Sequence, residues 1–295
     1  MADGTFRSGF CCFVGRPNAG KSTLMNVLVG EKVAITSSKP QTTRHAIRGI
    51  LHRPDAQLVV VDTPGLHRPR TLLGERLNDV VQSTLSGVDV IGFCVAADQP
   101  VGPGDRYIAE QLTSVRAAVV AVLTKTDLAK PPVIVRQLAE LAALGSFAEV
   151  VPVSAVDGSQ IDLLADLLVA QLPEAPPLYP EDIRTDEPTE SMIAELIREA
   201  ALEGVRDELP HSIAITVDEM QEEGGLTRIF ATLHVERDSQ KGIVLGHRGA
   251  RLRAVGTTAR AGIEALLETK VYLDLHVSVL GEWQRDPKKL DRLGF

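Results

Sequence analysis

The sequence predicts an α/β protein with two domains: a doubly wound, mostly parallel sheet, followed by a smaller α+β domain. Three observations support this prediction. Short continuous apolar runs alternate with helical patterns over the first 172 residues, which is typical of strands buried on both faces of a parallel sheet. A proline-rich acidic segment interrupts the pattern at 172–188. Beyond this segment, two runs alternate apolar and polar residues, as half-buried strands do.

The first domain is assigned to residues 1–174 and contains five predicted strands. The strands are predicted at 10–15, 58–62, 90–97, 117–123 and 149–153. Clear helical patterns follow the first and the last strand, at 21–28 and 160–171. Because each strand reads as a continuous apolar run, we expect helices on both faces of the sheet.

The second domain is assigned to 189–281, after a linker at 175–188 and before a C-terminal tail at 282–295. Five prolines between residues 172 and 188 favour an extended linker. The predicted order is helix, strand, strand, short helix, glycine loop, helix and strand. These elements occupy 190–202, 212–217, 227–235, 240–245, 246–249, 250–267 and 271–279.

Composition excludes several classes of protein. Of the 295 residues, 44% are hydrophobic and 24% are charged, which is ordinary for a globular protein. No apolar run reaches the ~18 residues of a membrane span, and the first residues lack a signal-peptide pattern. The three cysteines fit neither a disulfide framework nor a metal site. We therefore expect a cytoplasmic protein whose thiols lie in its core.

Charge is segregated along the chain, whose net value is −8. Residues 181–224 hold 3 basic and 14 acidic side chains, whereas residues 237–260 hold 6 basic and 1 acidic. The net charge argues mildly against a nucleic-acid partner. The basic segment, which surrounds a glycine loop, argues for one.

The motif "GRPNAGKS" at 15–22 predicts a phosphate-binding loop. A predicted strand precedes it and a helix follows, so backbone N–H groups and the helix N-terminus can face phosphate oxygens. We expect Lys21 to bridge β- and γ-phosphate oxygens and Ser22 to ligate Mg²⁺. The nucleotide-binding residues expected here are Gly15, Arg16, Pro17, Asn18, Ala19, Gly20, Lys21, Ser22 and Thr23.

Three later motifs, "DTPGL", "TKTD" and "PVSA", follow predicted strands and favour a guanine nucleotide, with Ser154 and Ala155 of "PVSA" able to close over the base. "DTPGL" places Asp62 where it can bind Mg²⁺ through water, and Gly65 where its N–H can meet the γ-phosphate. In "TKTD", Asp127 can accept hydrogen bonds from guanine N1–H and its amine, which adenine does not offer. Ligands bind at such strand ends in open α/β sheets. The expected contacts are Asp62, Thr63, Pro64, Gly65, Leu66, Thr124, Lys125, Thr126, Asp127, Ser154 and Ala155.

These motifs resemble those of the translation-factor class of GTPases. The resemblance identifies "KPQTTRHAIRGI" as a first switch, in which Thr43 ligates Mg²⁺ in the triphosphate state and Thr42 is the alternative. The switch residues are Gln41, Thr42, Thr43, Arg44 and His45. The implied metal ligands are Ser22, Thr43 and Asp62, and the implied catalytic residues are Lys21, Thr43, Gly65 and Asn18.

Two residues depart from the pattern of this class. Thr124 stands where Asn is usual, and a hydroxyl ties the base loop to the phosphate loop less completely than an amide. We therefore expect guanine selectivity with weaker nucleotide affinity. Leu66 stands where Ras-like enzymes have the Gln that orients water, so we expect slow hydrolysis. One hypothesis is that Asn18 helps to hold K⁺, as in related bacterial GTPases.

The basic segment "GIVLGHRGARLR" lies in an element order that resembles the type II KH domain. In such domains a G-x-x-G loop holds the backbone of single-stranded RNA. Related loops usually read G-K-G-G, so one basic position is shifted in this chain. The residues expected to bind RNA are Lys241, Ile243, Gly246, His247, Arg248, Gly249, Arg251 and Arg253.

The two domains together resemble the Era family of bacterial ribosome-assembly GTPases over essentially the whole chain. "ELPHSIAITVDE" and "WQRDPKKLDRLGF" also carry the resemblance. It implies GTP or GDP with Mg²⁺, and binding to the 3′ region of 16S rRNA during maturation of the small (30S) subunit. Family members also associate peripherally with the inner face of the cell membrane, although this sequence has no basic amphipathic anchor. We expect a monomer and no DNA partner.

Two alternatives stay open at this point. The chain could be a KH RNA-binding protein whose nucleotide domain is only structural, against which Lys21, Ser22, Asp62 and Asp127 speak. It could instead be a P-loop ATPase, against which Asp127 speaks.

Overall fold

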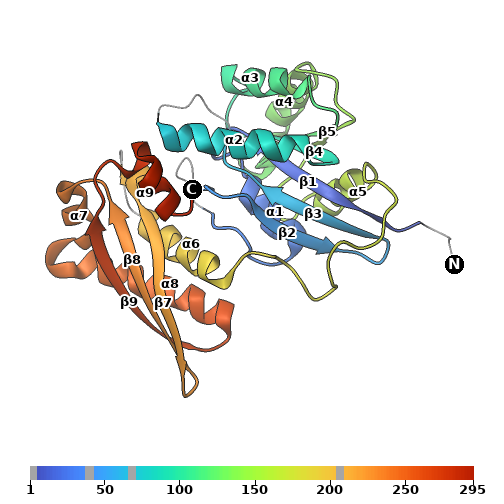
Figure 1. The fold of residues 1–295 in the computed structure, drawn as a ribbon. Coiled ribbons are helices and arrows are strands. Elements are labelled where there is room, and N and C mark those ends of the chain that lie inside the picture. The colour runs from blue at the N-terminus through green and yellow to red at the C-terminus, as the bar shows by residue number, and fades with distance from the viewer. Residues whose placement is uncertain (1–4, 37–42, 66–70, 204–208) are drawn as a thin grey trace. The chain divides into compact units, whose positions relative to one another are not determined.

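The computed structural model describes residues 5–36, 43–65, 71–203 and 209–295. The described chain forms two compact units (Figure 1). The first is built from residues up to Asp186, and the second mainly from Glu187–Phe295. The limits proposed from the sequence for the linker and for the tail stay predictions.

In its described part, the first unit contains a six-stranded sheet in the order β2-β3-β1-β4-β5-β6. The strands are β1 (Arg7–Gly15), β2 (Ile47–His52), β3 (Ala56–Asp62), β4 (Val90–Ala96), β5 (Ala118–Thr124) and β6 (Glu149–Pro152). Strand β2 runs antiparallel to β3, and the other pairs are parallel. Strand β2 was not predicted from the sequence, because residues 47–50 were assigned to the switch segment.

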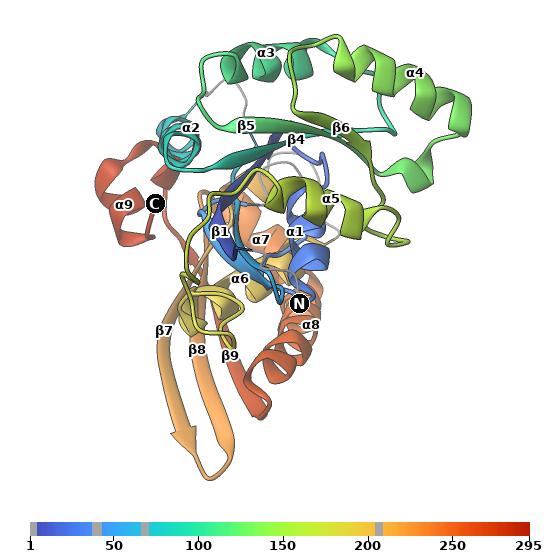
Figure 2. The same ribbon diagram turned by 90° about the vertical axis from the view of Figure 1, so that its right-hand side faces the viewer.

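Helices cover both faces of this sheet (Figure 2). On one face lie α1 (Lys21–Val29) and α5 (Ile161–Val169). On the other lie α2 (Leu72–Ser86), α3 (Pro103–Leu112) and α4 (Pro131–Ala142). This arrangement confirms the predicted doubly wound sheet. It also gathers the loops that follow β1, β3, β5 and β6 at one edge of the sheet.

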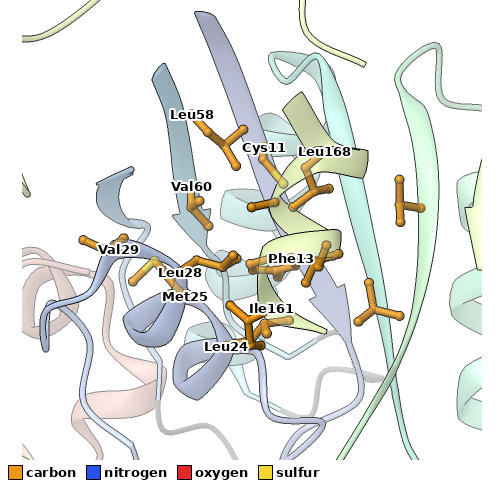
Figure 3. Close-up of a cluster of buried hydrophobic side chains, with 14 of the residues drawn as sticks. Cys11, Phe13, Leu24, Met25, Leu28, Val29, Leu58, Val60, Ile161 and Leu168 are labelled. Carbon is orange, nitrogen blue, oxygen red and sulfur yellow. The ribbon is translucent and has the colours of Figure 1, made fainter. Parts of the chain in front are cut away.

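The alternation of side chains along β1 supplies both hydrophobic cores. Cys11 and Phe13 point into the core shared with α1 and α5, where Figure 3 shows Phe13 beside Leu24 and Ile161. Cys12 and Val14 point into the core on the opposite face. A strand buried on both faces must be apolar at every position, which is why it reads as a continuous apolar run.

The segment 173–186 is not extended throughout: it bends and turns at residues 181–182, where the N–H of Ile183 donates to the carbonyl oxygen of Pro180 at 3.2 Å, and it is hydrogen bonded along the sheet. The backbone N–H of Ile50 in β2 donates to the carbonyl oxygen of Arg184 at 2.8 Å. Gln57 is buried, and its Nε2 donates to the carbonyl oxygen of Tyr179 at 2.8 Å. Arg48 pairs with Asp186 at 2.8 Å. The first of these bonds satisfies a backbone N–H that the edge strand β2 would otherwise leave open.

The second unit has, in its described part, a three-stranded sheet in the order β7-β8-β9. Its elements are α6 (Thr189–Leu202), β7 (Ala214–Glu223), β8 (Leu226–Val235), α7 (Asp238–Leu245), α8 (Ala250–Leu267) and β9 (Lys270–Val279). Strands β7 and β8 are antiparallel, whereas β8 and β9 are parallel. The element order is the predicted one. Strand β7 continues past the predicted end at residue 217, because a bulge between Val217 and Glu219 lets the pairing with β8 resume.

The C-terminal residues pack into the second unit. Trp283 is fully buried, its indole Nε1 donates to the carbonyl oxygen of Ser212 at 3.2 Å, and its ring stacks on Phe295 at 5.6 Å. A short helix, α9 (Pro287–Arg292), lies between the two aromatic residues in the sequence. Across the residues that the structure describes, no helix combines the length and the apolar character needed to span a bilayer.

Candidate functional site

The phosphate-binding motif connects β1 to α1. Gly20 is the N-cap of α1 and makes no side-chain cap to the first-turn N–H groups, so these groups can receive an anion. The ammonium of Lys21 is buried and lies 3.3 Å from the carbonyl oxygen of Gly15 and 3.2 Å from that of Arg16. Burial lowers the pKa of Lys21, and the carboxylate of Asp62 opposes that effect. A desolvated cation at a helix N-terminus suits a polyphosphate.

Three oxygen-bearing side chains meet beside Lys21. The hydroxyl of Ser22 donates to Oδ2 of Asp62 at 2.6 Å, and the hydroxyl of Thr43 donates to the same oxygen at 2.8 Å. The two hydroxyl oxygens are 3.1 Å apart. Burial raises the pKa of Asp62, an effect opposed by Lys21 and by the two hydroxyls. Ser22, Thr43 and Asp62 are the three residues predicted as metal ligands, and they converge.

The donor set fits Mg²⁺. Oδ1 of Asp62 is buried and has no hydrogen-bond partner among the residues that the structure describes. A buried carboxylate oxygen without a partner is costly, and a hard cation or a water bound to one would satisfy it. Mg²⁺ prefers carboxylate, hydroxyl, water and phosphate oxygens, as this site and a nucleotide would supply.

The segment after β3 lies against the phosphate loop. The hydroxyl of Thr63 donates to the carbonyl oxygen of Phe13 at 2.8 Å, which ties this segment to β1. At Gly65, a Cβ atom would lie 3.0 Å from the backbone nitrogen of Pro17. Glycine is therefore needed for this close approach, and Pro64 lies between the two contacts. Leu66 lies outside the described residues.

The base loop after β5 is joined to the phosphate loop through Thr124. Its buried hydroxyl donates to the carbonyl oxygen of Ala19 at 2.7 Å and lies 3.3 Å from that of Val95. The tie that we expected to be weakened is therefore present, although one hydroxyl proton serves two acceptors. Thr126 follows in the same loop, where its N–H donates to the carbonyl oxygen of Val153 at 3.2 Å.

Asp127, which is predicted to bind the base, is exposed, and a hydrogen bond from Ser154 orients its carboxylate. Asp127 accepts a hydrogen bond at Oδ1 from the hydroxyl of Ser154 at 2.8 Å, and Ser154 is buried. The backbone N–H of Asp157 donates in turn to the Ser154 oxygen at 3.3 Å. Ala155, the next residue after Ser154, is partly buried against the first core. The second carboxylate oxygen of Asp127 is thus positioned by a residue from the neighbouring strand end.

Sequence reasoning missed the loop after β4, which supports the base loop. Asp98 lies 3.2 Å from Nζ of Lys125, and the N–H of Ala97 donates to the carbonyl oxygen of Thr124 at 2.8 Å. The buried amide of Gln137 donates to the carbonyl oxygen of Ala97 at 3.0 Å. No motif marks these residues. The available signal was an acidic side chain just after a predicted strand, at the edge where ligands bind.

The other predicted nucleotide-site residues are placed as follows. Arg16 directs its guanidinium to Asp105, with Nε 2.8 Å from Oδ1, so its side chain does not lie with Lys21. Asn18 has a left-handed backbone, with φ of 63°. Thr23 lies in the first turn of α1. In the switch, Arg44 is buried and His45 is half-buried. Gln41 and Thr42, the latter the alternative to Thr43, lie outside the described residues.

The predicted RNA-binding residues lie around a turn between α7 and α8. Helix α7 ends at Leu245 with Gly246 as its C-cap, and residues 247–249 form a 3₁₀ turn in which Arg248 and Gly249 have φ of 50° and 75°. His247 and Arg248 are exposed, and Ile243 on α7 is 53% exposed. This turn therefore presents a cation and an apolar side chain to solvent.

The three arginines of this region, Arg248, Arg251 and Arg253, differ in the hydrogen bonds that their guanidinium groups make. Nη2 of Arg251 donates to the carbonyl oxygen of Glu203 at 2.8 Å, and Nη2 of Arg253 donates to that of Arg248 at 2.8 Å. The side chain of Arg248 is exposed, and its backbone carbonyl is the group that Arg253 engages. Lys241 is half-buried on α7. Arg248 is thus the arginine best placed to receive a phosphate.

Comparison with protein families matches both units. A family model described as "50S ribosome-binding GTPase" matches residues 10–125, and a model described as "KH domain" matches residues 208–284. Two solved structures align with the chain at a TM-score of 0.94 and 34% identity, covering 98% of this chain and 99% of theirs. One is Era in complex with MgGDPNP and nucleotides 1506–1542 of 16S ribosomal RNA, and the other is an Aquifex aeolicus Era variant bound to GDP·AlF4⁻.

Curated relatives share a higher identity over their whole length. "GTPase Era" of Streptomyces coelicolor is 60% identical, and the alignment covers 100% of this chain and 96% of the relative. "GTPase Era" of Mycolicibacterium smegmatis is also 60% identical, with 98% and 99% covered. These relatives confirm the GTPase activity predicted from the motifs. The chain therefore belongs to the Era family of GTPases.

Proposed function

We propose that the first unit binds GTP or GDP with Mg²⁺ through the site described above, and hydrolyses GTP. The observation that carries this proposal is the convergence of Ser22, Thr43 and the buried Asp62 beside the ammonium of Lys21. Ser22, Thr43 and Asp62 would hold the Mg²⁺ ion, which when bound supplies positive charge against the negative charge that develops on the phosphates. Lys21 would exchange its carbonyl partners for β- and γ-phosphate oxygens, and the Gly65 N–H would meet the γ-phosphate.

The base is proposed to lie beside Asp127. The carboxylate would accept hydrogen bonds from guanine N1–H and its exocyclic amine, while Ser154 holds one of its oxygens. Adenine lacks this pair of donors, so binding it would leave the Asp127 carboxylate without its hydrogen-bond partners, which disfavours ATP. Lys125 lies two residues before Asp127 in the same loop, and its stem would cover one face of the base.

Hydrolysis is proposed to be slow. Leu66 has no group that could orient the attacking water, and Asn18 is the candidate partner for a K⁺ ion near the phosphates. A monovalent cation there would stabilise charge that develops in the transition state. Equal turnover in potassium and sodium chloride would remove this part of the proposal.

The second unit is proposed to bind the 3′ region of 16S rRNA as the small subunit matures. Arg248 and Lys241 would meet phosphates, Gly246 and Gly249 would let the backbone approach, and Ile243 would contact a base. This assignment rests on the exposed turn between α7 and α8 and on the relative that was solved with nucleotides 1506–1542. The chain would act as a monomer in the cytoplasm. Peripheral membrane contact is proposed from the resemblance alone, and vesicle co-sedimentation tests it.

Phosphate release tests the proposed chemistry. The wild-type chain should release phosphate from GTP and not from ATP, and Lys21→Ala should abolish the release because no other buried cation faces Asp62 among the residues that the structure describes. Lys130→Ala provides a matched control, since Lys130 is an exposed lysine at the start of α4. Equal rates for wild type and Lys21→Ala would instead favour an RNA-binding protein with a structural nucleotide domain.

A further inference from the structure

Arg16 is the residue of the phosphate loop whose side chain leaves the nucleotide site. Its Nε donates to Oδ1 of Asp105 at 2.8 Å, and the backbone N–H of Gly102 donates to Oδ2 of Asp105, also at 2.8 Å. Asp105 lies in the first turn of α3 and its side chain is 1% exposed, whereas that of Arg16 is 28% exposed. A carboxylate buried to this degree requires its partners, because an unpaired buried charge is strongly destabilising.

The side chain of Arg16 packs on α3 at Gly104, where the absence of a side chain leaves room for its aliphatic part. A Cβ atom built on Gly104 would lie 2.7 Å from Cδ of Arg16 and 3.3 Å from its Cγ. The arginine side chain therefore crosses directly over the Cα of Gly104 before it reaches Asp105. The ion pair and the glycine are independent features, and both fix the same path for the side chain.

The backbone of Arg16 in turn holds two groups of the phosphate loop. Its carbonyl oxygen accepts a hydrogen bond from Nζ of Lys21 at 3.2 Å and another from the N–H of Ala19 at 3.2 Å. Pro17 follows Arg16 and restricts it to extended conformations. Anchoring the Arg16 side chain on α3 removes the remaining freedom of this peptide, so the loop is ordered before a nucleotide arrives.

We propose that Arg16 is a positioning residue, held by Asp105 and seated over Gly104, which fixes the phosphate loop for nucleotide binding and is not itself a phosphate ligand through its guanidinium. This inference rests on the proposed function, because it assigns a part of the same nucleotide site. It also assigns roles to Asp105 and Gly104, which lie in no nucleotide motif.

A double-mutant cycle on the full-length chain tests the pair. Arg16→Gln and Asp105→Asn should each raise the Kd for GDP about tenfold, which corresponds to about 1.4 kcal/mol. The Kd for GDP of the double variant should be no higher than that of the single variant with the higher Kd, since both changes remove one and the same anchor. Additive losses would show that Arg16 and Asp105 act separately, and unchanged or tighter binding in Asp105→Asn would overturn the proposal.

Gly104→Ala tests the geometry without removing a charge. Alanine favours helix over glycine, so a purely structural role for this position predicts an unchanged or higher unfolding temperature and unchanged binding. The proposal instead predicts a raised Kd for GDP, because the new methyl group displaces Arg16. Gly256→Ala in α8 is the matched control, since a Cβ there would meet nothing within 4 Å. Wild-type affinity in Gly104→Ala would contradict the proposal.

Steady-state kinetics separate positioning from loss of fold. Backbone contacts to the phosphates are made in both the ground state and the transition state, so the Arg16 and Asp105 variants should show a raised KM with kcat nearly unchanged. A partly unfolded preparation would show the reverse, a lowered kcat with an unchanged KM, and that result would contradict the proposal. If wild type itself neither binds nor hydrolyses GTP, the proposed function fails; if wild type is active and the variants match it, only this inference fails.

Discussion

Removing the hydroxyl of Thr124 is expected to weaken nucleotide binding without unfolding the protein. In Thr124→Val the side-chain volume is nearly kept, but the carbonyl oxygen of Ala19 loses its donor at 2.7 Å and that of Val95 loses its donor at 3.3 Å. Leaving a buried acceptor unsatisfied costs about 1–3 kcal/mol. If this cost falls mainly on the ordered, nucleotide-bound loops, the Kd for GDP should rise about 5- to 150-fold.

Titration calorimetry with GDP and Mg²⁺ measures this change directly. Thr84→Val is the matched control, because the Thr84 hydroxyl also donates to a backbone carbonyl, that of Val80 at 2.8 Å, but within α2. Thermal unfolding without nucleotide should show similar midpoints for the two variants. A Thr124→Val variant that binds GDP as tightly as the wild type would refute the claim that this hydroxyl joins the two loops.

Three further outcomes follow from the structure. Asp127→Asn should shift the nucleotide preference from guanosine towards xanthosine, because an amide can donate to the xanthine oxygen; unchanged selectivity in competition binding would contradict the base assignment. Gly249→Asp should weaken binding to single-stranded RNA, and reduce the salt dependence of that binding, more than Gly249→Asn does. Gly249 has φ of 75°, a conformation that both Asp and Asn tolerate, so the two variants differ only in charge. Burial lowers the pKa of His234 below its usual 6.5, so the folded state favours the neutral ring. The neutral ring therefore contributes stability above pH 6.5, and this stability should be lost as the pH falls through the folded-state pKa. Urea unfolding from about pH 8 to about pH 5 should show this loss, and His234→Gln should flatten the profile.

Much of the nucleotide site could be predicted from the sequence because each of its motifs is a short local pattern that directly follows a predicted strand. A phosphate loop needs Gly20, Lys21 and Ser22 at fixed spacing, and parallel strands bring Asp62 and Asp127 to the same edge. The fold class followed from the same reasoning, since strands buried on both faces must be continuously apolar.

The supporting contacts could not be predicted, because they join residues that are far apart in the sequence. The pairs Arg16 with Asp105 and Lys125 with Asp98 depend on how α3 and the loop after β4 pack, and neither pair forms a recognisable motif. Strand β2 was missed because residues 47–50 were assigned to the switch segment. It is an edge strand whose polar outer side is satisfied by residue 184, and only the folded chain brings these two segments together.

We propose that the guanine-nucleotide site and the RNA site carried by this chain are thermodynamically coupled, and RNA affinity in the two nucleotide states tests this claim most directly. Fluorescence anisotropy would measure binding of a labelled single-stranded oligonucleotide from the 3′ end of 16S rRNA to the full-length chain, with Mg²⁺ and either GDP or a non-hydrolysable GTP analogue. The claim predicts different RNA affinities in the two states. By linkage, the RNA must then change the ratio of the GTP-analogue affinity to the GDP affinity by the same factor that separates the two RNA affinities. Identical RNA affinities with GDP, with the analogue and without nucleotide would contradict it.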